Sequence, residues 1–350
     1  MSEYLLTIVV PIYNVERYLE QCLDSLVCQT VRDFEVILVN DGSTDNSGEI
    51  AKKYAEKHGF QYIYQENAGL GAARNTGLRN TNTPYVEFLD SDDWLMPSTV
   101  ESILRTARNE DDLVDIMFTT PVVYNMATKQ YEEWMDKHAV ESIFTRKHLT
   151  NPRELAEMYA LEPNVNRSIW SVAFLKKYKF EFPVGVKWED VYPHFFLFYH
   201  AHSCIYVRNA GFCYRINSGG QITSMSGIAR LDIIPAFKNS LCFAFENGWN
   251  EHEIAYIIRM METFVRWSMG IATKDVRKQL SVQVHELFNM IPKRCLKVYY
   301  QDFGFGRAVK LYFYLFRSPI FYQLLSNRHM QEFGFTCMQK LKHLLTWRKR

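Results

Sequence analysis

The sequence predicts an α/β protein built on a doubly wound, Rossmann-like sheet, with a helical region at its C-terminal end. Short apolar runs alternate with helical patterns through the first hundred residues, and the connections between them are short. Such alternation is typical of right-handed parallel βαβ units. Beyond residue 224 only the helical spacing of apolar residues continues.

The expected strands of the first hundred residues are continuous apolar runs, as strands covered on both faces should be. They occupy residues 5–10, 34–39, 60–64 and 84–89. Helices with apolar residues at i, i+3 and i+4 are expected between them, at residues 15–26, 46–57 and 69–78. Asp45 or Ser43 is the expected N-cap of the second helix.

After residue 112 the pattern is looser. We expect a strand at residues 114–118, a hairpin at 122–126 and 130–134, an aromatic helix at 191–199, and closing strands at 205–207 and 212–216. One apolar helix face extends from Ile254 to Val265. The sequence therefore predicts two domains, a nucleotide-binding domain at residues 1–225 and a helical region at residues 226–350.

The composition is that of an ordinary globular protein. Of the 350 residues, 47% are apolar and 23% are charged. The seven cysteines are odd in number and include no CxxC pair, which argues against a disulfide framework or a zinc site. The N-terminal apolar run is too short for a signal peptide, and no stretch has the roughly 18 apolar residues of a membrane span. We therefore expect a cytoplasmic protein.

Basic and aromatic residues are concentrated at the C-terminal end. Residues 307–350 contain nine Lys or Arg and one acidic residue, so this segment carries +8 and the remainder of the chain −7. Aromatic residues beside Lys and Arg suit the surface of an anionic membrane. A helical subdomain with a basic outer face, used in homo-oligomerisation, explains the composition equally well. Binding to single-stranded nucleic acid is the weakest of the three interpretations.

The expected strand at residues 84–89 ends on the carboxylates Asp90, Asp92 and Asp93. Open α/β sheets bind their ligands at the carboxyl ends of buried strands. Carboxylates there repel one another unless positive charge is present, and a hard divalent cation that carries phosphate oxygens supplies it. A solvated acidic turn before the next helix is the alternative.

Two further turns follow the first two expected strands. Pro11 and Tyr13 come after the first strand, and Asp41 comes after the second. The Asp41 carboxylate can accept a hydrogen bond from the imide N–H of a nucleotide base, while Tyr13 covers the ring. The first turn lacks the GxGxxG fingerprint of dinucleotide sites. A plain Asp41-Gly42 turn is the alternative.

Arg74 follows a loop with two glycines that opens the third expected helix. Glycine lets the backbone approach a ligand closely, and the fork of an arginine matches a phosphate group. Alternatively, Arg74 is solvated or pairs with Asp45.

Four segments taken together resemble glycosyltransferase family 2. They are VVPIYN at residues 9–14, VNDGSTD at 39–45, NAG at 67–69 with ARNTG at 73–77, and FLDSDD at 88–93. The resemblance is strong over residues 1–100, weaker to about residue 225, and does not extend to the last third. It implies a GT-A fold with a mixed sheet, a nucleotide-sugar donor that is usually a UDP-sugar, a Mg²⁺ or Mn²⁺ ion, and inversion at the anomeric carbon.

By position, the resemblance assigns nucleotide-binding roles to Pro11, Tyr13, Asp41, Arg74 and Asp90. Asp90 and Asp92 correspond to the family's DxD pair, in which we expect Asp92 to bind the metal and Asp90 to bind the ribose or the metal. Asp93 is expected to support this pair.

Inversion by direct displacement requires a base that removes the proton of the acceptor hydroxyl. In the family this base is usually the Asp of a downstream Glu-Asp pair, and Glu189-Asp190 is such a pair. We expect Asp190 to be the base, with Glu189 as the alternative. A helix N-terminus also explains two adjacent carboxylates, and it is compatible with the catalytic role.

Residues 214–224 resemble the segment that closes the family's catalytic domain, although the middle of the segment departs from the usual pattern. Arg215 or Thr223 is a candidate for contact with the diphosphate, and a hairpin with glycines at its turn is the alternative. His194, His200 and His202 lie near the expected base. We leave them out of the site, because a lone histidine more often has a structural role.

The sequence therefore predicts an inverting, metal-dependent glycosyltransferase. It would transfer a sugar from a nucleotide donor to a hydroxyl of a glycan or a lipid-linked oligosaccharide in the synthesis of a bacterial surface polysaccharide such as a capsule. A peripheral position on the inner face of the membrane would suit a lipid-linked acceptor. The rival hypotheses are a catalytically silent protein of the same fold that binds nucleotide sugars or glycans, and a nucleotidyltransferase that releases pyrophosphate.

Overall fold

The computed structural model describes residues 3–110, 112–146, 151–217 and 226–304. The chain divides into two compact units, Met1–Gln221 and Ile222–Arg350. The predicted basic segment at residues 307–350 and Thr223 lie outside the described residues.

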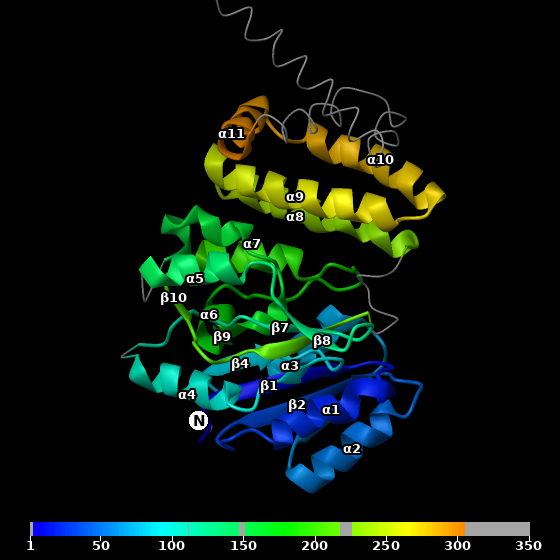
Figure 1. Cartoon of the computed structure of the whole chain (residues 1–350), viewed down its shortest axis with the longest axis vertical. Coiled ribbons are helices and arrows are strands. Elements are labelled where there is room, and N and C mark those ends of the chain that lie inside the picture. The colour runs from blue at the N-terminus through cyan, green and yellow to red at the C-terminus, as the bar shows by residue number, and fades with distance from the viewer. Residues whose placement is uncertain (1–2, 111, 147–150, 218–225, 305–350) are drawn as a thin grey trace, which may run out of the picture. The chain divides into compact units, whose positions relative to one another are not determined.

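The first unit is built on a seven-stranded sheet with the strand order β10-β6-β9-β4-β1-β2-β3 (Figure 1). These strands are β1 (Leu6–Ile12), β2 (Glu35–Asp41), β3 (Gln61–Gln65), β4 (Tyr85–Phe88), β6 (Ile116–Phe118), β9 (Ser168–Ser171) and β10 (Cys204–Tyr206). Strands β1 to β4 are parallel, whereas β9 is antiparallel to both β4 and β6. The sheet is therefore mixed, which confirms the predicted fold class.

Four helices accompany the first strands: α1 (Glu16–Val27), α2 (Ser47–His58), α3 (Leu70–Asn80) and α4 (Thr99–Asn109). All seven residues of β1 are buried, and the apolar face of α1 packs into the same core through Leu19 and Leu23. The predicted elements of the first hundred residues are confirmed, with ends that differ by up to two residues. The cap of α2 is a correction, since its N-cap is Asn46 rather than Asp45 or Ser43.

Helix α3 lies close against β1 at Gly77. A Cβ atom at this position would lie 2.1 Å from Val9 Cγ1, so no side chain fits between the helix and the strand. Glycine therefore sets the distance at which α3 packs on the sheet. Arg74 is one turn earlier on the same helix, and this packing brings it to the carboxyl ends of the strands.

Strand β9 was not predicted from the sequence. It is four residues long and lies between β4 and β6, in a segment that combines helical and loop signals. Around it are the short helices η1 (Pro152–Glu154), η2 (Ala156–Ala160), η3 (Val165–Arg167) and α6 (Val172–Lys177). Helices α5 (Lys137–Arg146) and α7 (Val191–His200) complete the described helices of this unit.

A second, four-stranded sheet has the order β5-β11-β7-β8. Its strands are β5 (Trp94–Leu95), β11 (Phe212–Ile216), β7 (Val122–Asn125) and β8 (Gln130–Glu133). The predicted hairpin is confirmed, because β7 and β8 are antiparallel neighbours. Strand β5 directly follows the acidic cluster and pairs with β11. This pairing connects the cluster to a strand about 120 residues later.

The second unit contains η5 (Ile228–Asp232), α8 (Ile233–Glu246), α9 (Glu251–Ile271), α10 (Lys274–Asn289) and α11 (Lys293–Phe303). The predicted apolar face of α9 is confirmed, since the residues from Ile254 to Val265 at helical spacing are buried. A capping box between Asn250 and Glu253 begins this helix. Within the described part of the chain, no helix is both long and apolar enough to cross a membrane.

Candidate active site

Three loops meet at the carboxyl ends of parallel strands. Tyr13 follows β1, Asp41 ends β2, and Asp90 follows β4. Strand β1 lies between β2 and β4, and all three run in the same direction. The structure therefore brings these three predicted segments to one edge of the sheet, where α/β proteins bind nucleotides.

Arg74 lies at the centre of a buried ion-pair cluster. Its Nη2 atom donates a hydrogen bond to Asp90 Oδ1 at 2.8 Å. Its Nη1 atom donates to Asp190 Oδ1 at 2.8 Å and to Glu189 Oε1 at 3.1 Å. The Arg74 side chain is fully buried, whereas those of Asp90 and Asp190 are 26% and 24% exposed. One guanidinium group thus joins the acidic loop after β4 to the Glu189-Asp190 pair at the start of α7.

The alternative pairing of Arg74 with Asp45 is not observed. Asp45 instead accepts hydrogen bonds from the backbone N–H groups of Ser47 and Glu16. Solvation of Arg74 is excluded by its burial.

The electrostatics of the cluster are unbalanced, because one cation faces three carboxylates. Burial alone would lower the pKa of Arg74, but the charges of Asp90, Asp190 and Glu189 outweigh it and raise this pKa. Burial and the charge of Asp190 raise the pKa of Glu189 to about 7, and burial also raises the pKa of Asp190. Both carboxylates therefore accept a proton more readily than solvated ones do.

Asp92 and Asp93 have different surroundings. Asp93 is buried, and its oxygens accept hydrogen bonds from Arg215 N at 2.8 Å and from Asn166 Nδ2 at 3.2 Å. Asp92 is partly exposed, and burial together with the charge of Asp90 raises the pKa of its carboxyl to about 6. Asp93 connects the acidic loop to neighbouring segments, while Asp92 remains in reach of a ligand.

Asp41 organises the loop before α3. Its Oδ1 accepts hydrogen bonds from Gln65 Nε2 at 2.7 Å and from Ala68 N at 2.9 Å. Its Oδ2 accepts from Gly69 N at 2.9 Å and from Asn67 Nδ2 at 3.2 Å. Asp41 is therefore more than a plain turn residue. A base imide N–H would have to replace one of these four donors, of which the two side-chain amides are the more easily moved.

Pro11 and Tyr13 lie at the end of β1 with opposite exposure. Pro11 is buried within the strand, and Tyr13 is 50% exposed, so its ring can cover a ligand. Asn14 follows Tyr13 and shapes this turn, because its φ of 47° lies in the left-handed region. Its Oδ1 accepts a hydrogen bond from Thr44 N at 2.8 Å, which ties the loop after β1 to the loop after β2.

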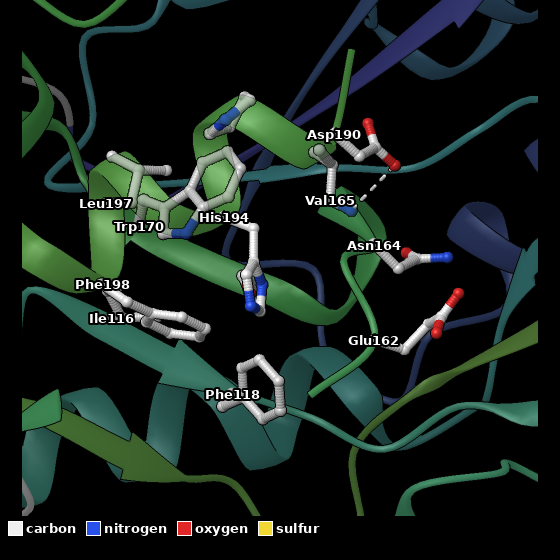
Figure 2. Close-up of a pocket in the computed structure, with 12 residues that line it drawn as sticks. Ile116, Phe118, Glu162, Asn164, Val165, Trp170, Asp190, His194, Leu197 and Phe198 are labelled. Atoms are coloured by element: carbon white, nitrogen blue, oxygen red, sulfur yellow. Dashed lines mark hydrogen bonds between the residues drawn. The ribbon is translucent and has the colours of Figure 1, made fainter. Parts of the chain in front are cut away.

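The surroundings of Asp190 combine an apolar wall with a polar edge (Figure 2). Asp190 Oδ2 accepts a hydrogen bond from Val165 N at 3.4 Å. In Figure 2 the side chains of Asp190, Asn164 and Glu162 extend to the same side, away from the ring of Phe198. The cavity that all of these residues line has a volume of about 20 Å³, which is room for about one water molecule. A ligand larger than water would therefore approach Asp190 from the polar edge rather than enter the cavity.

His194 lines the same cavity at a half-buried position. Burial lowers its pKa to about 3, and its Nε2 lies 3.4 Å from the carbonyl oxygen of Tyr159. His200 stacks on the ring of Tyr178 with the ring centroids 4.0 Å apart. Neither contact involves Asp190.

The family of the chain follows from a comparison with protein-family models. Residues 7–180 match the model of glycosyl transferase family 2, and they include the three strand ends and Arg74. The chain belongs to glycosyl transferase family 2. The predicted resemblance is therefore confirmed.

Two curated relatives show where the similarity lies. The glycosyltransferase GlyA of Streptococcus pneumoniae is 37% identical over 221 residues, which cover 61% of this chain and 31% of GlyA. The putative glycosyltransferase EpsH of Bacillus subtilis is 34% identical over 219 residues, which cover 60% of each chain. The matched part thus spans 31% of the length of GlyA and 60% of the length of EpsH.

Solved structures support the fold. S. aureus TarS 1-349 in complex with UDP-GlcNAc superimposes with a TM-score of 0.72, covering 94% of this chain and 92% of TarS 1-349 at 18% identity. The likeness confirms the predicted GT-A fold.

Sequence reasoning missed the residues that hold the segment beside Asp190 in this family 2 protein. Arg167 is fully buried, and its Nη1 and Nη2 donate to Asp136 at 2.7 and 2.9 Å. Asp136 Oδ2 also accepts a hydrogen bond from Glu162 N at 2.7 Å. The sequence places Arg167 two residues before Ile169 and Trp170, which does not reveal a partner 31 residues away.

The family implies a divalent cation, and the carboxylates of the acidic loop are the candidate ligands for it. Among the described residues, no cluster of three or more His, Cys, Asp or Glu side chains could hold a metal ion by itself. Mg²⁺, however, is usually bound by one or two carboxylates together with substrate phosphates and water. Asp92 and Asp90 provide such carboxylates, and their mutual repulsion favours a cation between them. The residues present therefore fit a metal that arrives with a diphosphate.

Proposed function

We propose that this family 2 protein is an inverting glycosyltransferase. It would move a sugar from a UDP-sugar to a hydroxyl of a glycan or lipid-linked oligosaccharide in surface polysaccharide synthesis. The observation that carries the proposal is that one side chain, Arg74, binds both Asp90 of the acidic loop and Asp190 of the later pair. Reacting groups must be held a few ångström apart. This cluster supplies Asp90 for the side of the sugar donor and Asp190 for the side of the acceptor.

Asp190 is the proposed base on the acceptor side. A hydroxyl is a poor nucleophile near neutral pH, and a nearby carboxylate that removes its proton makes the attack on the anomeric carbon faster. Arg74 and Val165 N hold the two oxygens of Asp190, so the carboxylate has a defined orientation. The acceptor would lie along the polar edge formed by Asn164 and Glu162.

The donor side is formed by the loops after β1, β2 and β4. We propose that Pro11, Tyr13 and Asp41 bind the base, and that Asp90 and Asp92 bind the ribose and the metal. With Mg²⁺ or Mn²⁺ bound, the site gains positive charge that offsets the negative charge on the departing diphosphate. Arg74 binds both Asp90 and Asp190, which supports a site in which donor and acceptor meet beside these two carboxylates.

The names of similar proteins support the proposed substrates. TarS was solved with UDP-GlcNAc, and a relative that is 39% identical over 120 residues is a minor teichoic acid biosynthesis protein, GgaB of Bacillus subtilis. A mannosyltransferase from Pyrobaculum calidifontis of related fold was solved with GDP-Man and Mn²⁺. The name of TarS favours a UDP-sugar donor for this chain, that of GgaB a cell-surface acceptor, and that of the mannosyltransferase a divalent metal.

The charge of residues 307–350 suggests where the enzyme works. A segment with net charge +8 is attracted to anionic lipid headgroups. We propose peripheral contact with the inner face of the membrane, where a lipid-linked acceptor would lie. Sedimentation with anionic vesicles should decrease on truncation after Gly306, and equal sedimentation of both proteins would contradict the contact.

A donor screen tests the function directly. The full chain is incubated with a panel of UDP-sugars, with and without Mn²⁺, and the released products are measured. Release of UDP that depends on Mn²⁺ supports the proposal. In a parallel incubation with UTP and sugar 1-phosphates, release of pyrophosphate with formation of a UDP-sugar would instead indicate a nucleotidyltransferase. Binding without turnover, with glycan acceptors present, would indicate a silent binding protein.

A further inference from the structure

Arg215 is a buried arginine of β11 that the proposed reaction does not use. Its side chain reaches the acidic loop, where Nε donates a hydrogen bond to the carbonyl oxygen of Asp92 at 2.7 Å. Its backbone N–H donates to Asp93 Oδ1 at 2.8 Å. Its Nη2 donates to Gln21 Oε1 on α1 at 2.8 Å. Only 3% of Arg215 is exposed, so its guanidinium is not open to a diphosphate in this structure.

Two aromatic rings hold the Arg215 guanidinium in place. Its central carbon lies 4.6 Å from the ring centroid of Tyr18 and 4.6 Å from that of Trp94. Tyr18 belongs to α1, and Trp94 begins β5 directly after the acidic loop. Cation–π contacts of this kind are strongest when they are shielded from water. The guanidinium of Arg215, itself on β11, therefore contacts both the acidic loop and α1 and holds them together.

The acidic loop needs such an anchor. Asp90, Asp92 and Asp93 bring three carboxylates together within four residues, and like charges at this spacing repel one another. The strand that follows, β5, has only two residues and cannot fix the loop by itself. Arg215 brings positive charge to the backbone side of the loop, and this leaves the Asp92 carboxylate free to face a ligand.

We propose that Arg215 is a positioning residue that holds the loop Asp90–Asp93 in the conformation in which Asp92 binds the metal–diphosphate group of the donor. It acts through Asp92 and Asp93 and does not touch the donor. The effect on the loop stands on the contacts of Arg215 alone. The effect on donor binding rests on the proposed function.

The first test measures the loop without any ligand. Arg215→Lys keeps the charge but loses the planar fork and the stacking. Hydrogen exchange is followed at the amide of Asp93, which donates to Asp90 O at 3.0 Å. We expect exchange at this amide to be faster by about tenfold, as for a locally loosened segment. Arg153→Lys is the matched control, because Arg153 also covers an aromatic ring, 4.6 Å from Tyr199, away from the loop.

A second variant keeps the test decisive if Arg215→Lys fails to fold. Gln21 is exposed, so Gln21→Leu removes one hydrogen bond of Arg215 without opening the core. We expect a smaller increase of exchange in the same amide. Wild-type exchange at Asp93 in both Arg215→Lys and Gln21→Leu would overturn the proposal.

The second test measures UDP binding by calorimetry with and without Mn²⁺. We expect Arg215→Lys to weaken the Mn²⁺-dependent binding by about tenfold or more, as for residues that orient metal ligands, and to leave metal-free binding unchanged. General destabilisation would instead weaken both. If the loop loosens while UDP binding stays at the wild-type level, the role in donor binding is overturned. If the wild-type chain itself binds no UDP with Mn²⁺, the proposed function fails while the exchange result still decides the role of Arg215 in the loop.

Discussion

Arg74 Nη1 lies 2.8 Å from Asp190 Oδ1, although the two residues are 116 positions apart in the sequence. The same guanidinium also binds Asp90. The separation between the acidic loop and the proposed base is therefore set by one buried side chain. Removing one partner of such a pair leaves a buried charge without compensation, which is strongly destabilising. The members of the cluster therefore depend on one another for their stability.

Asp190→Asn should separate binding from catalysis. The amide oxygen can still accept the hydrogen bond from Arg74, and only the longer one from Val165 N is lost, so the cluster keeps its shape while the amide cannot take a proton. We expect kcat for sugar transfer to fall by about 10² to 10⁴, with the donor KM within a few-fold of wild type. The measurement is steady-state release of UDP in the presence of acceptor.

Asp33→Asn is the matched control for that experiment, because the Asp33 side chain is 65% exposed and pairs with Arg108 on the surface. It should leave both kinetic constants unchanged. Turnover of Asp190→Asn near the wild-type rate would remove Asp190 as the base and shift attention to Glu189.

Asp92→Asn should weaken metal-dependent binding of UDP and raise the thermal stability of the metal-free protein. The amide is a weaker ligand for Mn²⁺, so we expect UDP binding to lose its dependence on Mn²⁺. Without metal, the repulsion between Asp92 and Asp90 also disappears, so the thermal midpoint of the metal-free protein should rise. Calorimetric titration and thermal unfolding check the two effects. Unchanged Mn²⁺ dependence would contradict the metal assignment.

The parts of the fold that could be predicted are those with a local signal. Strand β1 is buried on both faces, and its seven residues are buried without exception, so its apolar run marks it in the sequence. The acidic residues after β4 could be placed for the same reason, since the end of a buried run is visible. Strand β9 could not, because four residues with two serines carry no such pattern and the strand is defined by pairing with β4 and β6.

The candidate site shows the same division. The residue types of the cluster were identified, but the contacts of Arg74 could not be, because its partners Glu189 and Asp190 are more than a hundred positions away. For Arg215, contact with a diphosphate and a turn position were both open from the sequence. Its actual partner, the carbonyl oxygen of Asp92, is a backbone atom 123 positions away, and no side-chain pattern marks it.

Gly77→Ala should weaken the packing of α3 on β1. The added methyl group would lie 2.1 Å from Val9 Cγ1, so the helix or the strand has to move. We expect a loss of about 1–3 kcal/mol in the free energy of unfolding, as for other overpacked core sites. Gly270→Ala in α9 is the control, because its added Cβ would meet no atom of another described segment within 4 Å. It should be neutral or stabilising by up to about 1 kcal/mol. Equal midpoints for both variants in thermal unfolding would contradict the packing argument.

Glu87→Gln should change how stability depends on pH. Glu87 lies in β4 opposite Ile8 and Ile169, and its Oε2 has no hydrogen-bond partner among the described residues. Burial raises the pKa of Glu87 from its ordinary value of 4.5 to about 8. Between these values the folded state keeps a proton that the unfolded state releases. The free energy of unfolding therefore falls as pH rises through this window, by at most about 1.4 kcal/mol per pH unit for this group.

Glutamine has nearly the same shape and no charge, so Glu87→Gln should remove this part of the slope and be the more stable protein at pH 8. Chemical unfolding of both proteins at several values between pH 5 and pH 9 measures the difference, which cancels the contributions of other titrating groups. Glu66→Gln, at an exposed position, is the control and should keep the wild-type slope. Parallel curves for wild type and Glu87→Gln would mean that Glu87 is ionised in the folded protein throughout the range.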